Sequence, residues 1–521
     1  EAQRLQKPIL LSSGYFACHW CHVMQKENYQ DPEVADFLNQ HFISVKIDRE
    51  LHPHTDQALI DFSKKSAGHA GWPQHVILTP EGLPFYAFVY LPKAKLLTRL
   101  QRVVALWQSN PEQIRQIAHK AIVKSVPSSA IPLTLDQHQF IQSFNHQLRQ
   151  NMDELSGGLT SSQKFPKPPL LLTLIQQTKA PDDLQAWLEL TLDQMQSQGL
   201  NDAVHGGFFR YTVDPEWQHP HFEKMLYTQA LLAKLYFLAA KHFDNPLYLT
   251  TARKTLKYVE THLWNPATHL FMSSQSAIDA QGIEGGAYLW SRQSLKNRLT
   301  PSEFNTVNTA WQLSKTPPFE LGWLPKITQK HWPNIQAKLQ KSPNEFPTDH
   351  KSILSWNALL LSSYATAYQT DLPNQSHYAH QAQSLITGLQ NAFKIIPTPR
   401  ALDGQAQPMG IATLEDYALT VQALNDWQTV QAPVSRFDPS KKALMTWQSQ
   451  LIQQATQQFL TAAGWQLTSA PLLPGQRPYW ATPDADTPSA TAVLDCAHPK
   501  HLAQAQALLK ANPLDYASYA N

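Results

Sequence analysis

Two cysteines separated by two residues, Cys18 and Cys21, indicate chemistry more directly than any other part of this sequence. The apolar run 8–13 predicts a buried strand before them, and residues 19–30 contain no Pro or Gly that would stop a helix. Cys18 is therefore expected at a helix N-terminus, where the dipole lowers a thiol pKa from about 8.5 towards about 7. His19 should add to this stabilisation of a thiolate. Cys21, one turn further on, is expected to be the more buried, resolving thiol.

The same residues are compatible with other kinds of site. Cys18, Cys21 and His22 match the attachment pattern of a c-type haem, and they share a helix face from which they could hold zinc. A zinc site needs a fourth ligand, and the chain's only other thiol is Cys496, while a haem needs a distal ligand and a pocket. Two inert structural cysteines are a further alternative. The pattern favours the redox dithiol, so we expect no metal and no cofactor.

The segments that follow have the order of a small sheet with a parallel strand pair. Residues 31–33 supply an N-cap, a first-turn Pro and an acid for a helix, and residues 43–47 alternate as a strand. Residues 76–78 and 85–89 predict a hairpin. Pro73 stands just before this hairpin, the position at which thioredoxin-like folds carry a cis-proline that faces a Cys-x-x-Cys helix. It is the candidate for a cis peptide bond, because cis bonds are nearly confined to X–Pro.

These segments resemble the thioredoxin-like domain of the spermatogenesis-associated protein 20 family, which includes bacterial YyaL-type proteins. The motifs that carry the resemblance are residues 7–12, 18–24, 31–34, 45–50 and 71–73. The resemblance implies an α/β thioredoxin-like domain followed by an all-α (α/α)6 toroid, similar to six-hairpin glycosidases and N-acylglucosamine 2-epimerases. Ala203, Thr228 and Ala358 depart from the family pattern in the second part, which weakens an enzymatic interpretation of the toroid.

Length and composition also predict two parts. A chain of 521 residues, 42% hydrophobic, exceeds what one core usually spans. We place an N-terminally trimmed thioredoxin-like domain at residues 1–124, a linker at 125–135, where prolines break the helical periodicity, and a toroid at 136–521. The last helical hairpin is expected to be incomplete. Beyond the linker, amphipathic helical runs follow one another without a strict repeat.

Charge and cysteine content limit the partners and the compartment. A net charge of +2 without a basic cluster predicts no nucleic-acid partner, and the apolar stretches are too short and interrupted to cross a membrane. Three cysteines in so long a chain exclude a disulfide scaffold and suit a reducing compartment. We therefore expect a cytoplasmic protein with protein thiols or disulfides as partners, and the trimmed start leaves a periplasmic location open.

The long connections of the second part hold polar and aromatic residues suited to a sugar cleft. Asp202 and other carboxylates could perform acid–base chemistry, and Trp217 and other tryptophans could stack on sugar rings. The expected substrate-binding residues are Trp72, Arg210, His221, Glu223, Trp290, Trp356, Asn357, Glu415 and Asp416. Residues 221–224 predict the first turn of a helix, with His221 and Glu223 about 200° apart. The alternative is that these acids stand in helical first turns and the tryptophans belong to the core.

Three functions follow as hypotheses. The first is a thiol–disulfide oxidoreductase with Cys18, Cys21, His19 and Pro73 as catalytic residues and Trp72 beside Pro73 at the docking edge. Its potential should lie above the roughly −270 mV of thioredoxin. The second is a carbohydrate-binding or protein-interaction module with a vestigial catalytic cleft. The third is a sugar epimerase or hydrolase that acts through Glu223, Glu415 or Asp416.

Overall fold

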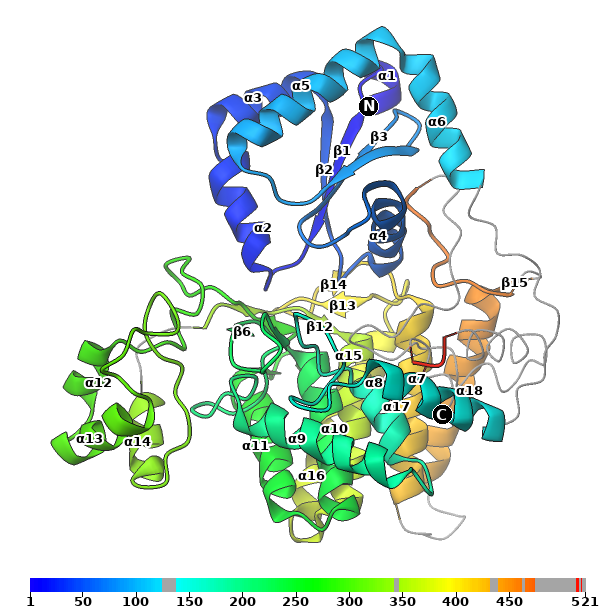
Figure 1. The fold of residues 1–521 in the computed structure, drawn as a ribbon. Coiled ribbons are helices and arrows are strands. Elements are labelled where there is room, and N and C mark those ends of the chain that lie inside the picture. Colours follow the sequence, from blue (N-terminus) through cyan, green and yellow to red (C-terminus); the bar gives the residue numbers. More distant parts are fainter. Residues whose placement is uncertain are drawn as a thin grey trace. The chain divides into compact units, whose positions relative to one another are not determined.

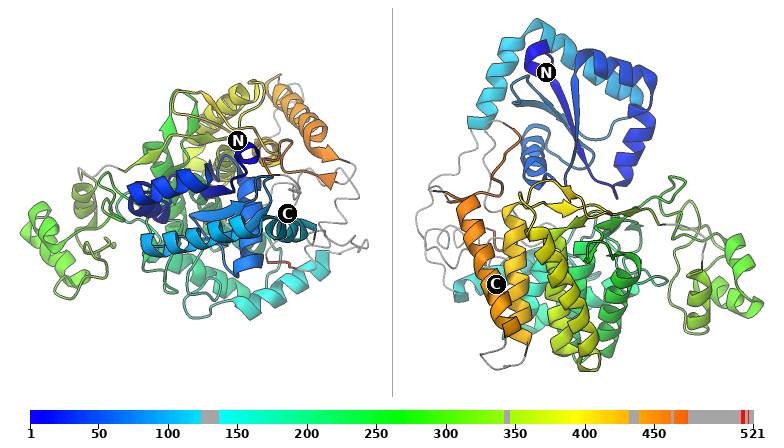
Figure 2. Two further views of the ribbon diagram at one scale, coloured as in Figure 1. Left: turned by 90° about the horizontal axis from the view of Figure 1, so that it is seen from above. Right: turned by 180° about the vertical axis from the view of Figure 1, so that it is seen from behind.

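The chain forms two compact units (Figure 1), which Figure 2 shows from two further directions. The computed structural model describes residues 1–123, 137–341, 346–431, 439–461, 464–473, 512–514 and 517. The first unit comprises Glu1–Ile131 and Phe459–Trp480, and the second comprises Pro132–Gln458 and Ala481–Asn521. The predicted linker at 125–135 and Cys496 lie outside the described residues. Unexpectedly, the segment Phe459–Trp480 returns to the first unit.

A four-stranded sheet in the order β2-β1-β3-β4 forms the centre of the first unit. Its strands are β1 (Ile9–Gly14), β2 (Ile43–Asp48), β3 (Gln74–Leu78) and β4 (Pro84–Phe88). β1 and β2 are parallel, with Gly14 opposite Asp48, whereas β3 runs antiparallel to both β1 and β4. The predicted strand–helix–strand unit with a following hairpin is confirmed. Both β1 and β2 therefore end at the same edge of the sheet, where the dithiol follows.

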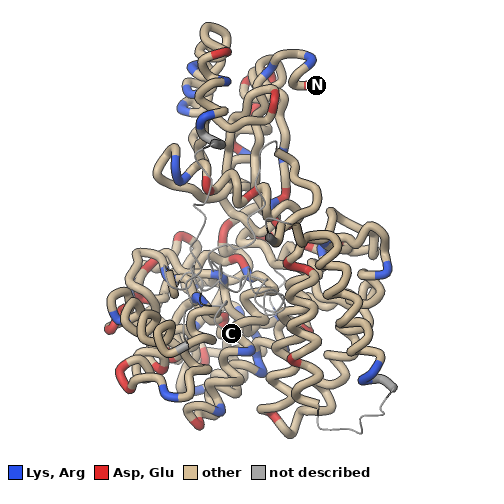
Figure 3. The backbone as a smooth tube through the Cα atoms, turned by 90° about the vertical axis from the view of Figure 1, so that its right-hand side faces the viewer, with Lys and Arg blue, Asp and Glu red and all other residues tan. Residues whose placement is uncertain are grey.

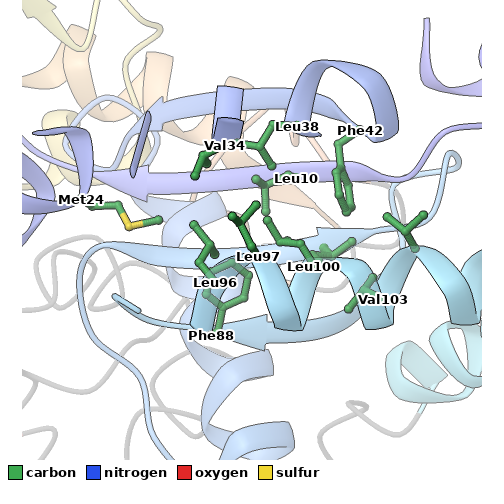
Figure 4. Close-up of a cluster of buried hydrophobic side chains, with 12 residues drawn as sticks. Leu10, Met24, Val34, Leu38, Phe42, Phe88, Leu96, Leu97, Leu100 and Val103 are labelled. Atoms are coloured by element: carbon green, nitrogen blue, oxygen red, sulfur yellow. The ribbon is translucent and has the colours of Figure 1, made fainter. Parts of the chain in front are cut away.

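Helices cover both faces of this sheet. They are α1 (Ala2–Leu5), α2 (His19–Met24), the π-helix η1 (Gln25–Tyr29), α3 (Pro32–His41), α4 (Pro53–Ala67), α5 (Lys93–Ser109) and α6 (Pro111–Val123). Strand alternation sends Leu10 and Leu11 to opposite faces. Leu10 joins a cluster that contains Val34 of α3 and Leu100 of α5 (Figure 4), whereas Leu11 packs in a second cluster with Leu59 of α4. The hairpin β15 (Leu460–Thr461) and β16 (Gly464–Trp465) lies in the returning segment.

Paired helices form most of the second unit. They are α7 (Gln137–Asn151), α8 (Pro168–Ile175), α9 (Asp182–Ser197), α10 (Leu226–His242), α11 (Pro246–His262), α15 (Leu354–Thr370), the short 3-10 helix η2 (Leu372–Asn374), α16 (Gln375–Phe393), α17 (Leu414–Val430) and α18 (Pro439–Phe459). α15 packs between α10 and α17, while α11 packs on α10 and α16 on α15. α10 and α15 are buried almost throughout their length, but α11 and α16 bury one side only. This arrangement of inner and outer helices is the helical fold that the sequence predicts.

Short strands lie at the N-terminal ends of the inner helices. They are β5 (Tyr211–Thr212), β6 (Pro220–His221), β7 (Lys224–Met225), β8 (Trp264–Asn265), β9 (Leu270–Phe271), β10 (Ser274–Gln275), β11 (Thr348–Asp349), β12 (Ser352–Ile353), β13 (Ala401–Leu402) and β14 (Pro408–Met409). β10 joins β7, which precedes α10, to β11, and β12 precedes α15 and pairs with β13. The second unit thus fixes its loops by strand pairing at this end.

Three further helices form an insertion between α11 and α15 in the second unit. They are α12 (Arg292–Arg298), α13 (Pro301–Ala310) and α14 (Trp332–Leu339). Leu295, Val307 and Ile335, one from each helix, belong to one apolar cluster, which Val204 also joins. The insertion therefore has a core of its own that is anchored to the loop after α9.

Two loops of the second unit share one construction. In each, an Asp stands four residues before a Gly-Gly pair, with Asp153 before Gly157 and Asp202 before Gly206. The Asp carboxylate accepts two backbone N–H groups of its own loop, and the first glycine donates its N–H to the Asp carbonyl. Both glycines of each pair have positive φ, which favours glycine. This repeated loop is only a few residues long and contains no helix, so a comparison of the helical segments does not reveal it.

A lysine from a later segment closes each of these loops. Lys164 Nζ lies 2.8 Å from Asp153 Oδ2 and donates to the Gly157 carbonyl, and Lys224 Nζ lies 2.7 Å from Asp202 Oδ2 and donates to the Gly206 carbonyl. Both lysines are buried. Each ammonium therefore satisfies a carboxylate and a backbone carbonyl at the same time, as a buried charge requires.

In the view of Figure 3, both basic and acidic residues are spread over many segments of the described chain. No helix within the described ranges is long and apolar enough to span a membrane.

Candidate functional site

Cys18 and Cys21 form a disulfide at the carboxyl end of β1. Cys18 is the N-cap residue of α2, and its Sγ accepts a hydrogen bond from the Cys21 N–H at 3.1 Å. A sulfur in this position faces the positive end of the helix dipole, so on reduction it is stabilised as a thiolate. The predicted position of the dithiol, after a strand and at the start of a helix, is confirmed.

The expected order of burial is wrong. Cys18 is 4% exposed, whereas Cys21 is only partly buried. An N-cap residue precedes the helix, so its burial depends on the turn before it, and the neighbouring Ala17 of that turn is fully buried. The sulfur of Cys21 lies against the backbone of Gly14, since a Cβ there would be 2.9 Å from it. Helical spacing cannot reveal either contact.

The two histidines around the dithiol have different surroundings. His22 Nε2 is 2.7 Å from the carbonyl oxygen of Phe16, so this ring ties α2 to the preceding turn. His19 is the first residue of α2, and its ring packs edge-on against Trp20. Because the disulfide engages both sulfurs and His22 contacts the backbone, the geometry favours the dithiol over the haem and zinc alternatives.

Trp72 and Pro73 lie at the same edge of the sheet as the dithiol, and the peptide bond between them is cis, as predicted. Trp72 Nε1 donates to Asp56 Oδ1 at 2.9 Å, and the Ser13 hydroxyl donates to the same oxygen at 2.6 Å. The Arg49 guanidinium carbon lies 3.8 Å from the centroid of the Trp72 ring, and its Nε lies 3.6 Å from Asp56 Oδ2. Asp56 thus connects β1 with the loop of Trp72. Sequence reasoning missed it, because an acid in a helical first turn is common.

A buried polar group on the other face of β1 was also missed. Tyr29 OH lies 2.5 Å from His75 Nε2 and donates to the Ser12 hydroxyl at 3.2 Å. Burial lowers the pKa of His75 to about 3 and raises the pKa of Tyr29 to about 12. His75 stacks on Phe88, with ring centroids 4.6 Å apart. Both side chains are therefore neutral around pH 7, so this polar group adds no charge to the core beneath the sheet.

In the second unit, the structure brings together three of the predicted site residues. Arg210 Nη1 lies 3.0 Å from Glu223 Oε1, and His221 Nδ1 lies 3.8 Å from the same oxygen. On its other side, His221 Nε2 lies 3.6 Å from Glu284 Oε1, and its ring stacks on Tyr211. Arg210, His221 and Glu223 are buried. We call Arg210, His221, Glu223 and Glu284 the arginine–histidine cluster.

The helical turn predicted for residues 221–224 is wrong. His221 ends β6, Lys224 begins β7, and α10 starts only at Leu226. Pairing of β6 with β5 and of β7 with β10 keeps this stretch extended. Residues two apart point to the same side of extended chain, so His221 and Glu223 converge and are not about 200° apart.

Glu415 and Asp416 belong to a different group. Arg400 donates to Glu415 Oε2 at 2.7 Å and to Asp416 Oδ1 at 2.8 Å. Asp416 Oδ2 accepts from both the N–H and the hydroxyl of Thr413, so it completes a capping box at the start of α17. These contacts match the alternative interpretation of Asp416 as a first-turn acid.

Asn357 and Asp202 make contacts that support the fold. The amide of Asn357 accepts the Phe271 N–H at 2.7 Å and donates to the carbonyls of Phe271 and Ile353. Asp202 closes its loop with Lys224. Burial alone would raise the pKa of Asp202, but the ammonium of Lys224 holds it below its usual range.

The three tryptophans proposed for sugar stacking are packed against protein. Trp217 is fully buried, and its Nε1 donates to the Ser156 carbonyl. Trp356 is 6% exposed and packs edge-on against Tyr227. Trp290 pairs through its backbone with Trp323, and its side chain packs on the core of the insertion. These contacts match the alternative that such residues are core.

Comparisons with known proteins agree with the two-part fold. The family described as "Thioredox_DsbH: Protein of unknown function, DUF255" matches residues 1–126. Spermatogenesis-associated protein 20 of Homo sapiens is 32% identical over 329 residues, which are 57% of this chain and 41% of that protein. Uncharacterized protein B0495.5 of Caenorhabditis elegans is 35% identical over 335 residues, 59% of this chain and 45% of its own. The resemblance to this family is confirmed, and the chain spans less than half the length of these relatives.

Solved structures resemble each part separately. Cellobiose 2-epimerase from Spirochaeta thermophila DSM 6192 is 14% identical with a TM-score of 0.41, and the match covers 74% of this chain and 83% of that one. A structure described as "DsbH Oxidoreductase" is 23% identical with a TM-score of 0.17, over 20% of this chain and 77% of its own. At these identities and scores, the likenesses give no information about substrate.

Proposed function

We propose that the first unit catalyses thiol–disulfide exchange through Cys18 and Cys21. The observation that supports this best is the Cys18 sulfur at the N-cap of α2, bonded to the Cys21 sulfur and accepting a hydrogen bond from the Cys21 N–H. A thiolate that is stabilised in this way is both a nucleophile and a good leaving group near neutral pH.

In the reducing direction, the Cys18 thiolate attacks one sulfur of a protein disulfide. A mixed disulfide with Cys18 forms, and the other substrate sulfur leaves as a thiolate that takes up a proton. The Cys21 thiolate then attacks the Cys18 sulfur, so the Cys18–Cys21 disulfide forms and the second substrate thiol is released. Two electrons pass from the dithiol to the substrate disulfide, and the reverse sequence oxidises a substrate dithiol.

The test is a titration of the full chain in defined ratios of reduced to oxidised glutathione, with alkylation of free thiols and a gel shift as the readout. We expect one two-electron transition that disappears in Cys18→Ser and in Cys21→Ser. Cys496→Ser is the matched control and should leave the transition unchanged. A chain whose Cys18 and Cys21 never form an intramolecular disulfide would overturn the proposal.

A second proposal concerns the arginine–histidine cluster. Two carboxylates that flank an imidazole, with an arginine on one of them, can accept and donate hydrogen bonds to a polyol and can move a proton. We infer that this cluster binds a saccharide, with Glu223 and His221 as the polar contacts.

Thermal shift and calorimetry with a panel that includes mannose and cellobiose would test this second proposal. Binding should be lost in Glu223→Gln and retained in Glu189→Gln, a matched change of an exposed glutamate on α9. If no saccharide shifts the unfolding temperature of the second unit, the cluster is structural.

A further inference from the structure

Two lysines of the second unit, Lys315 and Lys326, line one hollow without an ion pair to a carboxylate of the described residues. Pairs of a lysine with a carboxylate within 4.0 Å are Lys164 with Asp153, Lys224 with Asp202, Lys234 with Asp426, Lys338 with Glu303 and Lys351 with Asp349. Among the described residues, neither Lys315 nor Lys326 has a carboxylate within 4.0 Å, although the Asp214 carboxylate interacts electrostatically with Lys326 from further away. Lys326 Nζ instead lies 3.2 Å from Gln218 Oε1, a neutral acceptor. Both lysines line the same hollow.

This hollow lies between the segment 311–326, which follows α13, and the residues that precede β6. Its volume is about 370 Å³, within the range of small-molecule sites. The wall of the hollow is partly aromatic and includes Trp311, Phe319 and Trp323. The ring centroids of His219 and Phe319 lie 5.2 Å apart. An apolar wall with a few polar groups is the usual lining of a site for a small molecule.

Backbone contacts fix the walls of the hollow. Trp323 and Trp290 exchange two backbone hydrogen bonds of 3.0 and 2.9 Å. A Cβ at Gly322 would lie 2.2 Å from the Trp290 carbonyl oxygen, so glycine permits this close approach. Trp311 Nε1 donates to the Lys326 carbonyl at 2.9 Å. A ligand would therefore meet a preformed site, which reduces the entropy lost on binding.

The lining is basic. None of the residues that line the hollow is acidic, and Lys315, Lys326 and His219 contribute positive or ionisable groups to the lining. Asp214 lies nearby, but it accepts three backbone N–H groups of its own loop and the ring of His219 lies 3.4 Å from it. The C-terminal end of α13 adds a partial negative charge of about half a unit, which one lysine more than offsets. The hollow therefore favours an anionic group.

We propose that this hollow binds a small organic anion of about the size of a monosaccharide. Its phosphate or carboxylate lies between Lys315 and Lys326, and its ring lies against Phe319. The hollow is formed by residues of the second unit alone, and binding there does not depend on thiol exchange. It is also distinct from the proposed saccharide contacts of Glu223, because it recognises charge.

Calorimetric titration of the full chain tests the proposal, with tryptophan fluorescence as a second readout because Trp311 and Trp323 line the hollow. The probes are glucose 6-phosphate, glucuronate, glucose and inorganic phosphate. We expect saturable binding of at least one anionic sugar, with glucose and inorganic phosphate each bound at least tenfold more weakly. The first two probes distinguish a phosphate from a carboxylate ligand.

Variants then assign the site. The double change Lys315→Gln and Lys326→Gln should weaken binding of the anionic sugar at least tenfold, whereas Lys296→Gln with Lys330→Gln, two exposed lysines outside the hollow, should not. Phe319→Ala should weaken the sugar but not inorganic phosphate. Equal binding of glucose, equal binding of inorganic phosphate, or binding that the lysine pair does not affect would each overturn the proposal, as would no binding at all.

Discussion

The dithiol and the arginine–histidine cluster are assembled in opposite ways. Four consecutive residues place Cys18 and Cys21, and one helix N-terminus gives them their electrostatic environment. The cluster needs residues that are far apart in sequence, because Arg210 and Glu284 reach His221 and Glu223 only through short strands and loops. A local site can thus be recognised from spacing, whereas a distributed site depends on the pairing of the whole unit. The two sites should therefore respond differently to substitution.

Loss of the nucleophile should have the largest effect. Cys18→Ser is expected to lower the rate of disulfide exchange by at least a thousandfold, about 4 kcal/mol, because the Cys21 thiol that remains lacks the N-cap position that stabilises a thiolate. Stopped-flow measurement with a peptide disulfide provides the rate. Glu223→Gln should leave this rate unchanged. An equal loss in both variants would show that the two sites are not independent.

Removal of one buried ammonium should unfold part of the second unit only. Lys224→Met leaves Asp202 as an uncompensated buried carboxylate and is expected to cost about 3–5 kcal/mol. Hydrogen exchange of the α10 and α11 amides measures this loss, while the amides of β1 should keep their protection.

Lys164→Met is the matched variant in the Asp153 loop, which has the same construction as the Asp202 loop. Its partner Asp153 is 20% exposed in the side chain, against 4% for Asp202, so water can solvate the carboxylate that remains. The cost should therefore be smaller than for Lys224→Met. Equal costs would mean that burial of the aspartate does not determine the effect.

The next largest effect is expected from Gly14→Ala, which adds one methyl group beside the dithiol. In Gly14→Ala the new Cβ would lie 2.9 Å from Cys21 Sγ, and overpacking of this kind costs about 1–3 kcal/mol. Denaturation in urea of the oxidised chain measures the effect. Gly71→Ala is the control, because a Cβ there meets no atom within 4 Å. If both variants are equally stable, Cys21 is not held against β1.

Acid should weaken the first unit through His75. Its pKa is about 3 in the fold against 6.5 for an ordinary histidine, so below pH 6.5 the unfolded chain binds a proton that the folded chain does not. Stability should fall by up to about 1.4 kcal/mol per pH unit between pH 6 and 4. The difference between wild type and His75→Phe in urea melts isolates this contribution. Parallel pH profiles for the two proteins would rule out a role for His75.

The smallest effect should come from His19. Replacement by Gln removes an imidazole next to the Cys18 thiolate, so the reduced form is less stable and the potential falls by about 10–20 mV, about 0.5–1 kcal/mol. The glutathione titration detects this shift, and His41→Gln, on α3, is the control. A rise in potential would contradict the proposed stabilisation of the thiolate by His19.

Local signals explain what the sequence predicted. The strand before Cys18, the Asp31 cap of α3 and the Asp416 cap of α17 each involve residues within four positions of one another. Pairing with distant strands is not visible in this way, and for that reason His221 was assigned to a helix. The same limit applies to Asp56, which binds Trp72 from sixteen residues away. The sequence therefore singles out His221 but not its partner, and it reveals neither the role of Asp56 nor its contact with Trp72.

Because Phe459–Trp480 belongs to the first unit, this unit is built from two separate stretches of the sequence. Leu473, from the returning segment, packs on the cluster of Leu11 and Leu59 beneath the sheet. A single cut after residue 131 would therefore release a dithiol fragment with one side of that cluster uncovered. Expression of the dithiol unit by itself would require the two stretches to be spliced together, with the intervening helical unit replaced by a short bridge.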